Sequence, residues 1–300
     1  MRLLFVHAHF DDYEFTAAGT FELFRRKHGD GVRRRVLVCT DGGAGHHQMS
    51  REETVRRRLW EQEQAAAKGG FEFRLLKDPE GHPFREARLR TASAFLPALW
   101  REIREFEPDY LFCPPIPAGT LSGVHIDHLD VAEAVRAVAY LINVPHAFSP
   151  EYPPEGGETG EARFVRTPVI LNVFDGYMAE GQGHDLAVDV TGVADFVADL
   201  AWCHESQLKE WLPWVDRHNL SVPRDLDGWR PQFRELVNRR KGSLGLGAVP
   251  GLFEVFVVTA WGLIPKLEDL VRDFPAIDSQ ASPRERLGTK LSAWAGRPGE

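Results

Sequence analysis

Short apolar runs alternate with stretches of helical periodicity through the first two thirds of the chain. Four runs have the length and near-continuous apolarity of buried strands: "RLLFVHA" (2–8), "RVLVCT" (35–40), "FEFRLL" (71–76) and "DYLFCPP" (109–115). Helical patterns follow each of them, over 17–27, 51–68, 91–106 and 128–141. This alternation predicts an α/β fold with a Rossmann-like, mostly parallel sheet and helices on both faces.

The remainder of the chain is less regular. We predict a strand at 167–174, a long amphipathic helix at 191–211, a late strand at 251–261 and a last helix over "IPKLEDLVRDF". The segment 149–164 is rich in Pro, Gly and Glu and is expected to be a surface loop.

We expect a single domain over residues 1–278. Its core would cover about 1–210, and 211–278 would be a C-terminal elaboration, within which 215–250 shows no clear periodicity. From 279 to 300 the sequence is polar, and we expect a poorly ordered tail.

Charge and composition narrow the class of partner. The net charge of −8 and pI of 5.9 argue against nucleic-acid or anionic-membrane binding. No apolar run approaches the roughly 18–20 residues of a membrane span, and "MRLLFVHA" is too short for a signal peptide. Cys39, Cys113 and Cys203 form no CxxC pair, which is typical of a reduced, cytoplasmic protein.

Polar segments follow three of the predicted strands. They are "HAHFDD", "TDGGAG" and "PPIPAGTLSGVHIDH". In parallel sheets, ligands bind outside the carboxyl ends of the strands, so we expect these segments to meet at one edge of the sheet.

The first of these segments has the residues of a metal site. His9 and Asp12, at i and i+3 in a turn, can point at one spot, and imidazole and carboxylate suit zinc or another divalent metal. A third ligand could come from "HIDH" (125–128). Asp11 would remain as a free base, an arrangement suited to metal-assisted hydrolysis. Alone, His9 and Asp12 would more simply form a turn in which the aspartate caps a helix, and only the two segments together favour a metal.

The same segments resemble a known family. "AHFDDYE" (8–14) is similar to the "AHPDDxE" signature of the LmbE-like, or PIG-L, family of metal-dependent N-deacetylases, and "HIDH" to its "HPDH". "TDGGAG" resembles its T-x-G-x-x-G turn, and a helix with Arg58 and Glu61 follows, as in the family. The likeness runs in order over about residues 2–210, with a weaker echo near residue 254.

The resemblance implies a role for each matching residue. His9, Asp12 and His128 would hold Zn²⁺, with Fe²⁺ as another suitable metal. Asp11 would activate the attacking water, and His125 would stabilise the oxyanion or protonate the departing amine. Asp127 and Glu14 would support these groups from behind, and Arg58 would contact the substrate. The implied reaction is removal of an acetyl group from an N-acetylated amino sugar or related conjugate, a small-molecule substrate.

The chain departs from the family pattern at several positions. Phe10 and Ile126 replace prolines, which should alter the rigidity of both turns without removing a ligand. Gly43 or Ala44 stands where an acidic residue is common. Among the other histidines, we expect His204 to be packed in the core. His7 should point to the same side as His9, and we assign it no role.

Two other functions use the same residues. His9, Asp12 and His128 could form the two-histidine, one-carboxylate site of an Fe(II) enzyme, although the α/β pattern does not favour that class. The other alternative is a non-catalytic sugar-binding module. Asp11 argues against it, because binding alone does not need an unligated carboxylate beside the metal. Homo-oligomerisation is left open.

Overall fold

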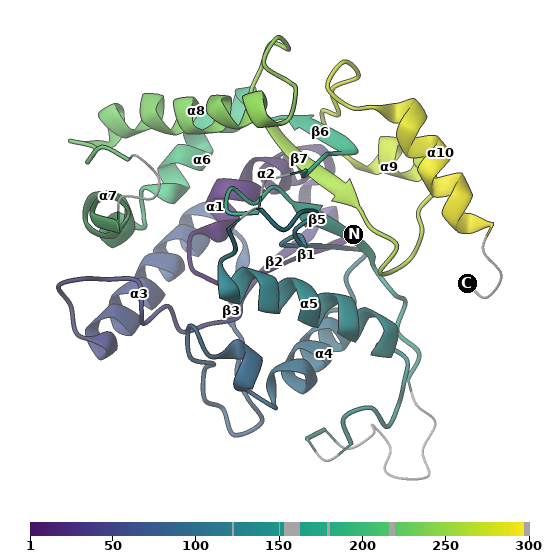
Figure 1. The fold of residues 1–300 in the computed structure, drawn as a ribbon, viewed down its shortest axis with the longest axis horizontal. Helices are drawn as coiled ribbons and strands as arrows, with labels where there is room; N and C mark the ends of the chain where they lie inside the picture. The colour runs from purple at the N-terminus through teal and green to yellow at the C-terminus, as the bar shows by residue number, and fades with distance from the viewer. Residues whose placement is uncertain (122, 150, 153–162, 179–180, 216–219, 297–300) are drawn as a thin grey trace.

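The computed structural model describes residues 1–121, 123–149, 151–152, 163–178, 181–215 and 220–296. Its centre is a seven-stranded sheet in the order β3-β2-β1-β4-β5-β7-β6 (Figure 1). The strands are β1 (Arg2–His7), β2 (Arg33–Val38), β3 (Glu72–Leu75), β4 (Tyr110–Cys113), β5 (Val169–Val173), β6 (Leu186–Asp189) and β7 (Phe253–Val258). The first five strands pair in parallel, whereas β7 runs antiparallel to both β5 and β6. The predicted mostly parallel sheet is confirmed.

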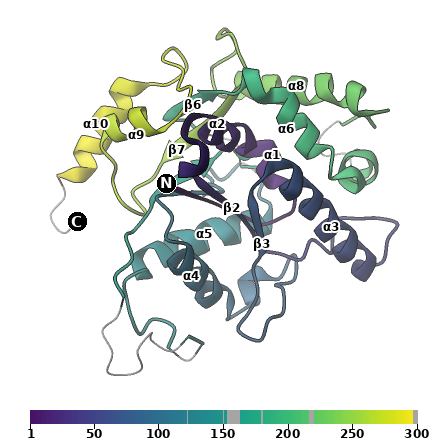
Figure 2. The same cartoon turned by 180° about the vertical axis from the view of Figure 1, so that it is seen from behind.

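Helices cover both faces of the sheet, because alternate strand residues point to opposite sides. On β1, Leu4 and Val6 pack into one core under α4 (Phe95–Phe106) and α5 (Ile126–Leu141). Leu3 and Phe5 pack into the other core, under α1 (Asp12–Thr16), α2 (Ala18–His28) and α6 (Ala194–Ala201). Figure 2 shows this second layer from behind, with α3 (Arg51–Gly69) beside it. The capping box of Ser50 and Glu53 starts α3.

The helix predicted over 191–211 is interrupted. After a 3₁₀ turn at Thr191–Val193, α6 ends at Ala201, and a π-helical turn at Gln207–Trp211 then leads into α7 (Leu212–Val215). Glu61 on α3 accepts hydrogen bonds from the backbone N–H (2.8 Å) and the hydroxyl (2.7 Å) of Ser206. This carboxylate satisfies the amide that a continuous helix would have bonded internally, and so supports the break.

The C-terminal part contains structure that the sequence pattern did not indicate. Helix α8 (Leu226–Ser243) begins at Asp225, whose carboxylate accepts a hydrogen bond from Gly228 N–H at 2.8 Å. It buries Trp229, Phe233 and Val237, one residue per turn, and most of its other residues are polar. That spacing is too sparse to stand out as an amphipathic pattern.

The expected polar tail after residue 279 is mostly helical, which corrects our prediction. After α9 (Leu267–Asp273), α10 spans Arg284–Ala295 and buries Leu287 and Leu291. Lys290 also reaches Asp185, with its ammonium 2.5 Å from the carboxylate. Two leucines one turn apart are enough to dock this otherwise polar helix. Among the described residues, no helix is long and apolar enough to cross a membrane.

Strand β7 is joined to helix α2, in the second layer of helices, by a buried carboxylate. Glu254 accepts hydrogen bonds from the backbone N–H of Gly19 (2.8 Å) and of Thr20 (2.7 Å), in the first turn of α2. An acidic side chain at a helix N-terminus satisfies amides that have no partner within the helix. The weak family likeness near residue 254 thus coincides with a contact that holds α2.

Candidate metal centre

The turn after β1 folds back on itself. β1 ends at His7 and α1 begins at Asp12, with Asp11 between them in the left-handed conformation at φ 87°. The Asp12 carboxylate accepts a hydrogen bond from the backbone N–H of His9 at 2.8 Å. This bond closes the turn and sets the imidazole of His9 beside the carboxylate, as the i, i+3 spacing predicted.

The structure brings the three predicted metal ligands together. His9 Nδ1 lies 3.1 Å from His128 Nε2. The Asp12 carboxylate lies 3.5 Å from each nitrogen, with Oδ2 nearest to His9 Nδ1 and Oδ1 nearest to His128 Nε2. In a tetrahedral zinc site with bonds of about 2.0–2.1 Å, ligand atoms stand about 3.3 Å apart. The separations of these three side chains therefore match the space that one such ion needs.

Buried carboxylates fix how the two imidazoles face each other. The far nitrogen of His9, Nε2, lies 3.2 Å from Asp127, and that of His128, Nδ1, lies 2.7 Å from Asp175. A carboxylate accepts the imidazole N–H, so we assign the protons to these far nitrogens. The near nitrogens lie 3.1 Å apart, within hydrogen-bond distance. Burial acts to lower the pKa of His9, but the carboxylates of Asp12 and Asp127 raise it well above its ordinary value, so His9 Nδ1–H can donate to His128 Nε2. A metal ion bound between these nitrogens would take the place of that proton.

His7, to which the sequence assigned no role, belongs to the same cluster. It is 1% exposed and stacks on Phe5, and its Nδ1 lies 2.5 Å from the Asp12 carboxylate. Its other ring nitrogen, Nε2, makes no hydrogen bond with any described residue. With Asp12 and His128 it forms one of three groups, within the described parts of the chain, whose ligand atoms could hold a metal ion. The other two are His9 with His125 and His128, and His9 with Glu86 and Asp127. Strand alternation placed His7 on the correct side, but only the structure shows how close it lies.

Asp11 stands next to these ligands with its carboxylate directed elsewhere. Its nearest charged partner is Arg58, at 3.2 Å. Burial raises the pKa of Asp11 to about 6, despite the nearby guanidinium of Arg58, which acts to lower it. A carboxyl group with such a pKa can both take up and release a proton near neutrality.

Arg58, which we predicted to contact the substrate, is buried beside the turn that contains Asp11. Its guanidinium donates a hydrogen bond to the Phe10 carbonyl and lies 3.3 Å from His204 Nδ1. Arg58 therefore holds this turn, and its contact with a substrate stays a prediction.

Glu14 supports the site only indirectly. Its carboxylate lies 3.4 Å from both Gln62 Nε2 and His204 Nε2. Gln62 in turn lies 3.4 Å from the backbone N–H of Asp11. His204 is buried as predicted, but it sits within this polar network behind Asp11 rather than in a purely apolar core.

His125 lies at the start of α5, with its ring 4.5 Å from that of His9 and 4.6 Å from that of His128. Burial, together with the neighbouring His9 and His128, lowers the pKa of His125 to about 3. The imidazole is therefore neutral at neutral pH. A neutral ring can donate one hydrogen bond but is a poor source of a proton.

The residues that replace the family prolines have opposite surroundings. The Phe10 ring is fully buried, packs edge-on against Phe73 and occupies the space beside Gly42, where a Cβ would lie 2.6 Å from it. Gly42 also has a positive φ of 63°, which favours glycine. Ile126, by contrast, is 42% exposed. Packing therefore anchors the first turn in place of the proline ring.

A cavity of about 500 Å³ opens at this cluster. Its inner end is lined by His7, Asp11, Asp12 and His128, and its side by Asp175 and Tyr177, which follow β5. Because β5 is parallel to β4, its carboxyl end lies at the same edge of the sheet. The rule that ligands bind at the carboxyl ends of parallel strands could therefore have indicated Asp175 and Tyr177 from the sequence. The far wall comes from α8, which sequence reasoning missed. Most of the surface loop predicted at 149–164 lies outside the described residues.

A parallel α/β sheet with a histidine–carboxylate cluster at its carboxyl edge defines the class of the protein. Within that class, residues 4–139 match the family model described as PIG-L, GlcNAc-PI de-N-acetylase. The chain thus contains a PIG-L, or LmbE-like, family domain over these residues, as the sequence motifs indicated. Comparison with curated protein sequences gives no significant match.

Solved structures share the fold at low identity. N,N'-diacetylchitobiose deacetylase from Pyrococcus horikoshii superposes with a TM-score of 0.58 and 18% identity, over 87% of this chain and 84% of that chain. A deacetylase triple mutant of the teicoplanin biosynthetic pathway gives 0.52 and 16%, over 87% and 99%. GalB, the 4-carboxy-2-hydroxymuconate hydratase from Pseudomonas putida KT2440, gives 0.56 and 14%, over 88% and 97%. A hydratase among these neighbours means that the fold alone does not define the reaction.

Proposed function

We propose that the protein is a metal-dependent N-deacetylase that removes the acetyl group from an N-acetylated amino sugar or a related conjugate. The observation on which this depends is the pair of imidazole nitrogens facing each other at 3.1 Å beside Asp12, with the free carboxylate of Asp11 next to them. The family description and the deacetylases among the structural neighbours support this choice. The free state of the three cysteines supports a cytoplasmic setting.

His9, Asp12 and His128 would hold the metal ion. Two imidazoles and one carboxylate are a donor set that suits Zn²⁺, and Fe²⁺ accepts the same set. When bound, such a cation supplies Lewis acidity that polarises the acetamide carbonyl and lowers the pKa of water. Asp127 and Asp175 would accept the far N–H of the two imidazoles, which leaves the near nitrogens to face the ion.

Asp11 would take the proton from the attacking water. Arg58 holds both the Asp11 carboxylate and the carbonyl of the preceding residue, so the base is fixed in place. With a pKa near neutrality, Asp11 could return the same proton to the departing nitrogen. His125 is uncharged at neutral pH, so it would donate its N–H to the developing oxyanion rather than protonate the departing amine.

Acetate release tests this proposal. The chain would be stripped of metal with a chelator, reloaded with Zn²⁺ or anaerobically with Fe²⁺, and assayed for acetate and free amine with N-acetylglucosamine and its glycosides. We expect metal-dependent release that falls about 10²–10⁴-fold in Asp11→Asn. Asp30→Asn, at an exposed position, is the matched control.

Two outcomes would contradict the proposal. Full activity in Asp11→Asn would show that the assigned base is wrong. Tight sugar binding without acetate release from any N-acetylated sugar would favour a binding module.

A further inference from the structure

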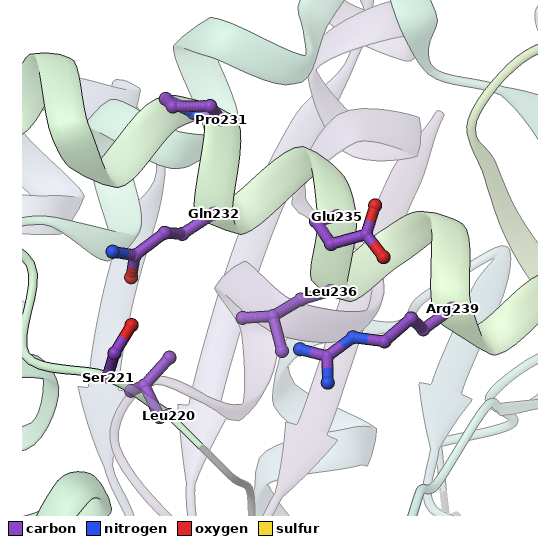
Figure 3. A pocket seen from close by; sticks show the side chains of 7 residues that line it. All are labelled: Leu220, Ser221, Pro231, Gln232, Glu235, Leu236 and Arg239. Atoms are coloured by element: carbon purple, nitrogen blue, oxygen red, sulfur yellow. The ribbon is translucent and has the colours of Figure 1, made fainter.

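The cavity at the metal centre ends against α8, and a second cavity adjoins it there. The first cavity is bounded on this side by Leu220, Leu236, Arg239 and Arg240. The second has a volume of about 470 Å³ and lies along the outer side of α8 (Figure 3). Leu220, Leu236 and Arg239 line both cavities. An extended ligand bound at the metal centre would therefore meet this wall.

Arg239 is the charged residue common to the two cavities. It makes no hydrogen bond or ion pair with any described residue, and Figure 3 shows its guanidinium turned back along α8 towards Leu236. Other arginines on this helix are paired: Arg230 lies 2.8 Å from Asp199, and Arg234 lies 2.9 Å from Asp195. Among the described residues of α8, Arg239 is thus the arginine without a hydrogen-bond or ion-pair partner.

Arg240 adds a second guanidinium to the same wall. It donates a hydrogen bond to the Phe15 carbonyl and lies over the Phe174 ring, but no carboxylate among the described residues is within ion-pair distance. Arginine at a largely buried position is usually paired with an anion. Glu235 is the acidic residue nearest in sequence, and it lines only the second cavity. Both guanidinium groups therefore border the first cavity without an ion-pair partner among the described residues. Burial lowers the pKa of Arg240 to about 10, while the more distant carboxylates of Glu254 and Asp175 act to raise it.

The opposite end of the cavity has the opposite charge. Asp11 and Asp12 line it at the metal centre. This distribution would repel an anionic group at the metal end and attract it at the α8 end. A substrate with one acidic group and one acetamide would consequently bind in a single direction.

We propose that Arg239, together with Arg240, binds an anionic group of the substrate, a carboxylate or a phosphate, while the acetamide lies at the metal centre. This inference rests on the proposed deacetylase function. It narrows the substrate class to N-acetylated amino sugars that are linked to an acidic group. Guanidinium groups suit either anion, because their planar donors match carboxylate and phosphate oxygens.

Matched substrates test the proposal. β-N-acetylglucosaminides would be prepared whose linked group ends in a carboxylate, a phosphate or the neutral carboxamide, with spacers of increasing length. KM for acetate release would be measured for the metal-loaded wild type, for Arg239→Gln and for the control Arg234→Gln. Calorimetric binding of the same compounds to metal-loaded Asp11→Asn, with and without Arg239→Gln, would report affinity independently of turnover.

We expect at least one acidic substrate to have a KM about tenfold below that of its carboxamide. This ratio should fall close to one in Arg239→Gln and persist in Arg234→Gln. Whether the carboxylate or the phosphate gives the larger ratio identifies the anion. Equal KM values for acidic and neutral partners, with acetate still released, would overturn the acidic subsite and leave the deacetylase intact. Selective calorimetric binding of acidic compounds that depends on Arg239, without acetate release by the wild type, would instead overturn the deacetylase.

Discussion

The two ends of the cavity are built in different ways. At the sheet edge, His9, Asp12 and His128 are each held by at least one further hydrogen bond or carboxylate, and the cluster is largely buried. At the α8 wall, Arg239 is exposed and has no described partner. Groups for chemistry need fixed geometry, whereas groups that select a ligand need free bonding capacity. We infer that reaction and selectivity are assigned to separate segments of the chain.

The strongest test of this division removes a ligand at the sheet edge. We expect Asp12→Ala to lose the metal and to lower deacetylation on the order of 10³-fold or more, since the cluster would retain only two of its three donors. Metal content by elemental analysis and acetate release give the two readouts. A variant that retains both would break the assignment of the sheet edge to the chemistry.

The pH profile tests the base at the same end. Burial raises the pKa of Asp11 to about 6. A bound cation would bring this pKa down again, because it favours the ionised carboxylate. Asp11 must be ionised to accept a proton, so activity should fall about tenfold per pH unit as the pH drops below that pKa. The acid limb of kcat/KM therefore has its midpoint below about pH 6, and it should vanish in Asp11→Asn. A wild-type profile flat down to pH 4 would contradict the assignment.

A smaller effect is expected from the residue behind His128. Asp175→Asn should weaken metal binding about 10–100-fold, because the amide holds the imidazole less firmly and lowers its basicity. Competition with a chromophoric chelator measures this affinity, and Asp185→Asn, away from the site, provides a comparison. An unchanged affinity would indicate that His128 does not depend on Asp175 for its orientation.

The smallest effect concerns the join between the C-terminal region and the sheet edge. Glu254→Gln should lower the free energy of unfolding by roughly 1 kcal/mol, since the charge-assisted bonds to the first turn of α2 are replaced by weaker ones. Urea denaturation measures this change. Glu235→Gln, at an exposed position on α8, should leave stability within about 0.5 kcal/mol of the wild type. Equal stabilities of both variants would show that α2 does not depend on Glu254.

The sequence was most informative where function depends on neighbouring residues. The turn with His9 and Asp12 is local, and the edge rule for parallel sheets predicted that the segment 125–128 would meet it. These two relations follow from short spacing and strand direction, both of which can be read without coordinates. The family resemblance singled out His128 within that segment and predicted that Asp127 orients an imidazole, and in the structure Asp127 lies beside His9.

Longer-range packing decided the rest. Arg58 turned inwards because the Phe10 carbonyl and Asp11 offer it buried partners, and helical periodicity gives no sign of either. Asp175 approaches His128 across 47 positions of sequence. Helix α8 buries only one residue per turn, so its place on the cavity wall could not be inferred from hydrophobic spacing.

The carboxylate of Glu254 has a consequence for how the chain can be divided. The family match ends at residue 139, yet α2, inside that match, starts on a side chain contributed more than a hundred residues later. A fragment cut at the end of the match would also expose the β4 edge that normally pairs with β5. The loops between these segments can therefore vary in length, but a fragment that keeps α2 in this arrangement also needs strand β7.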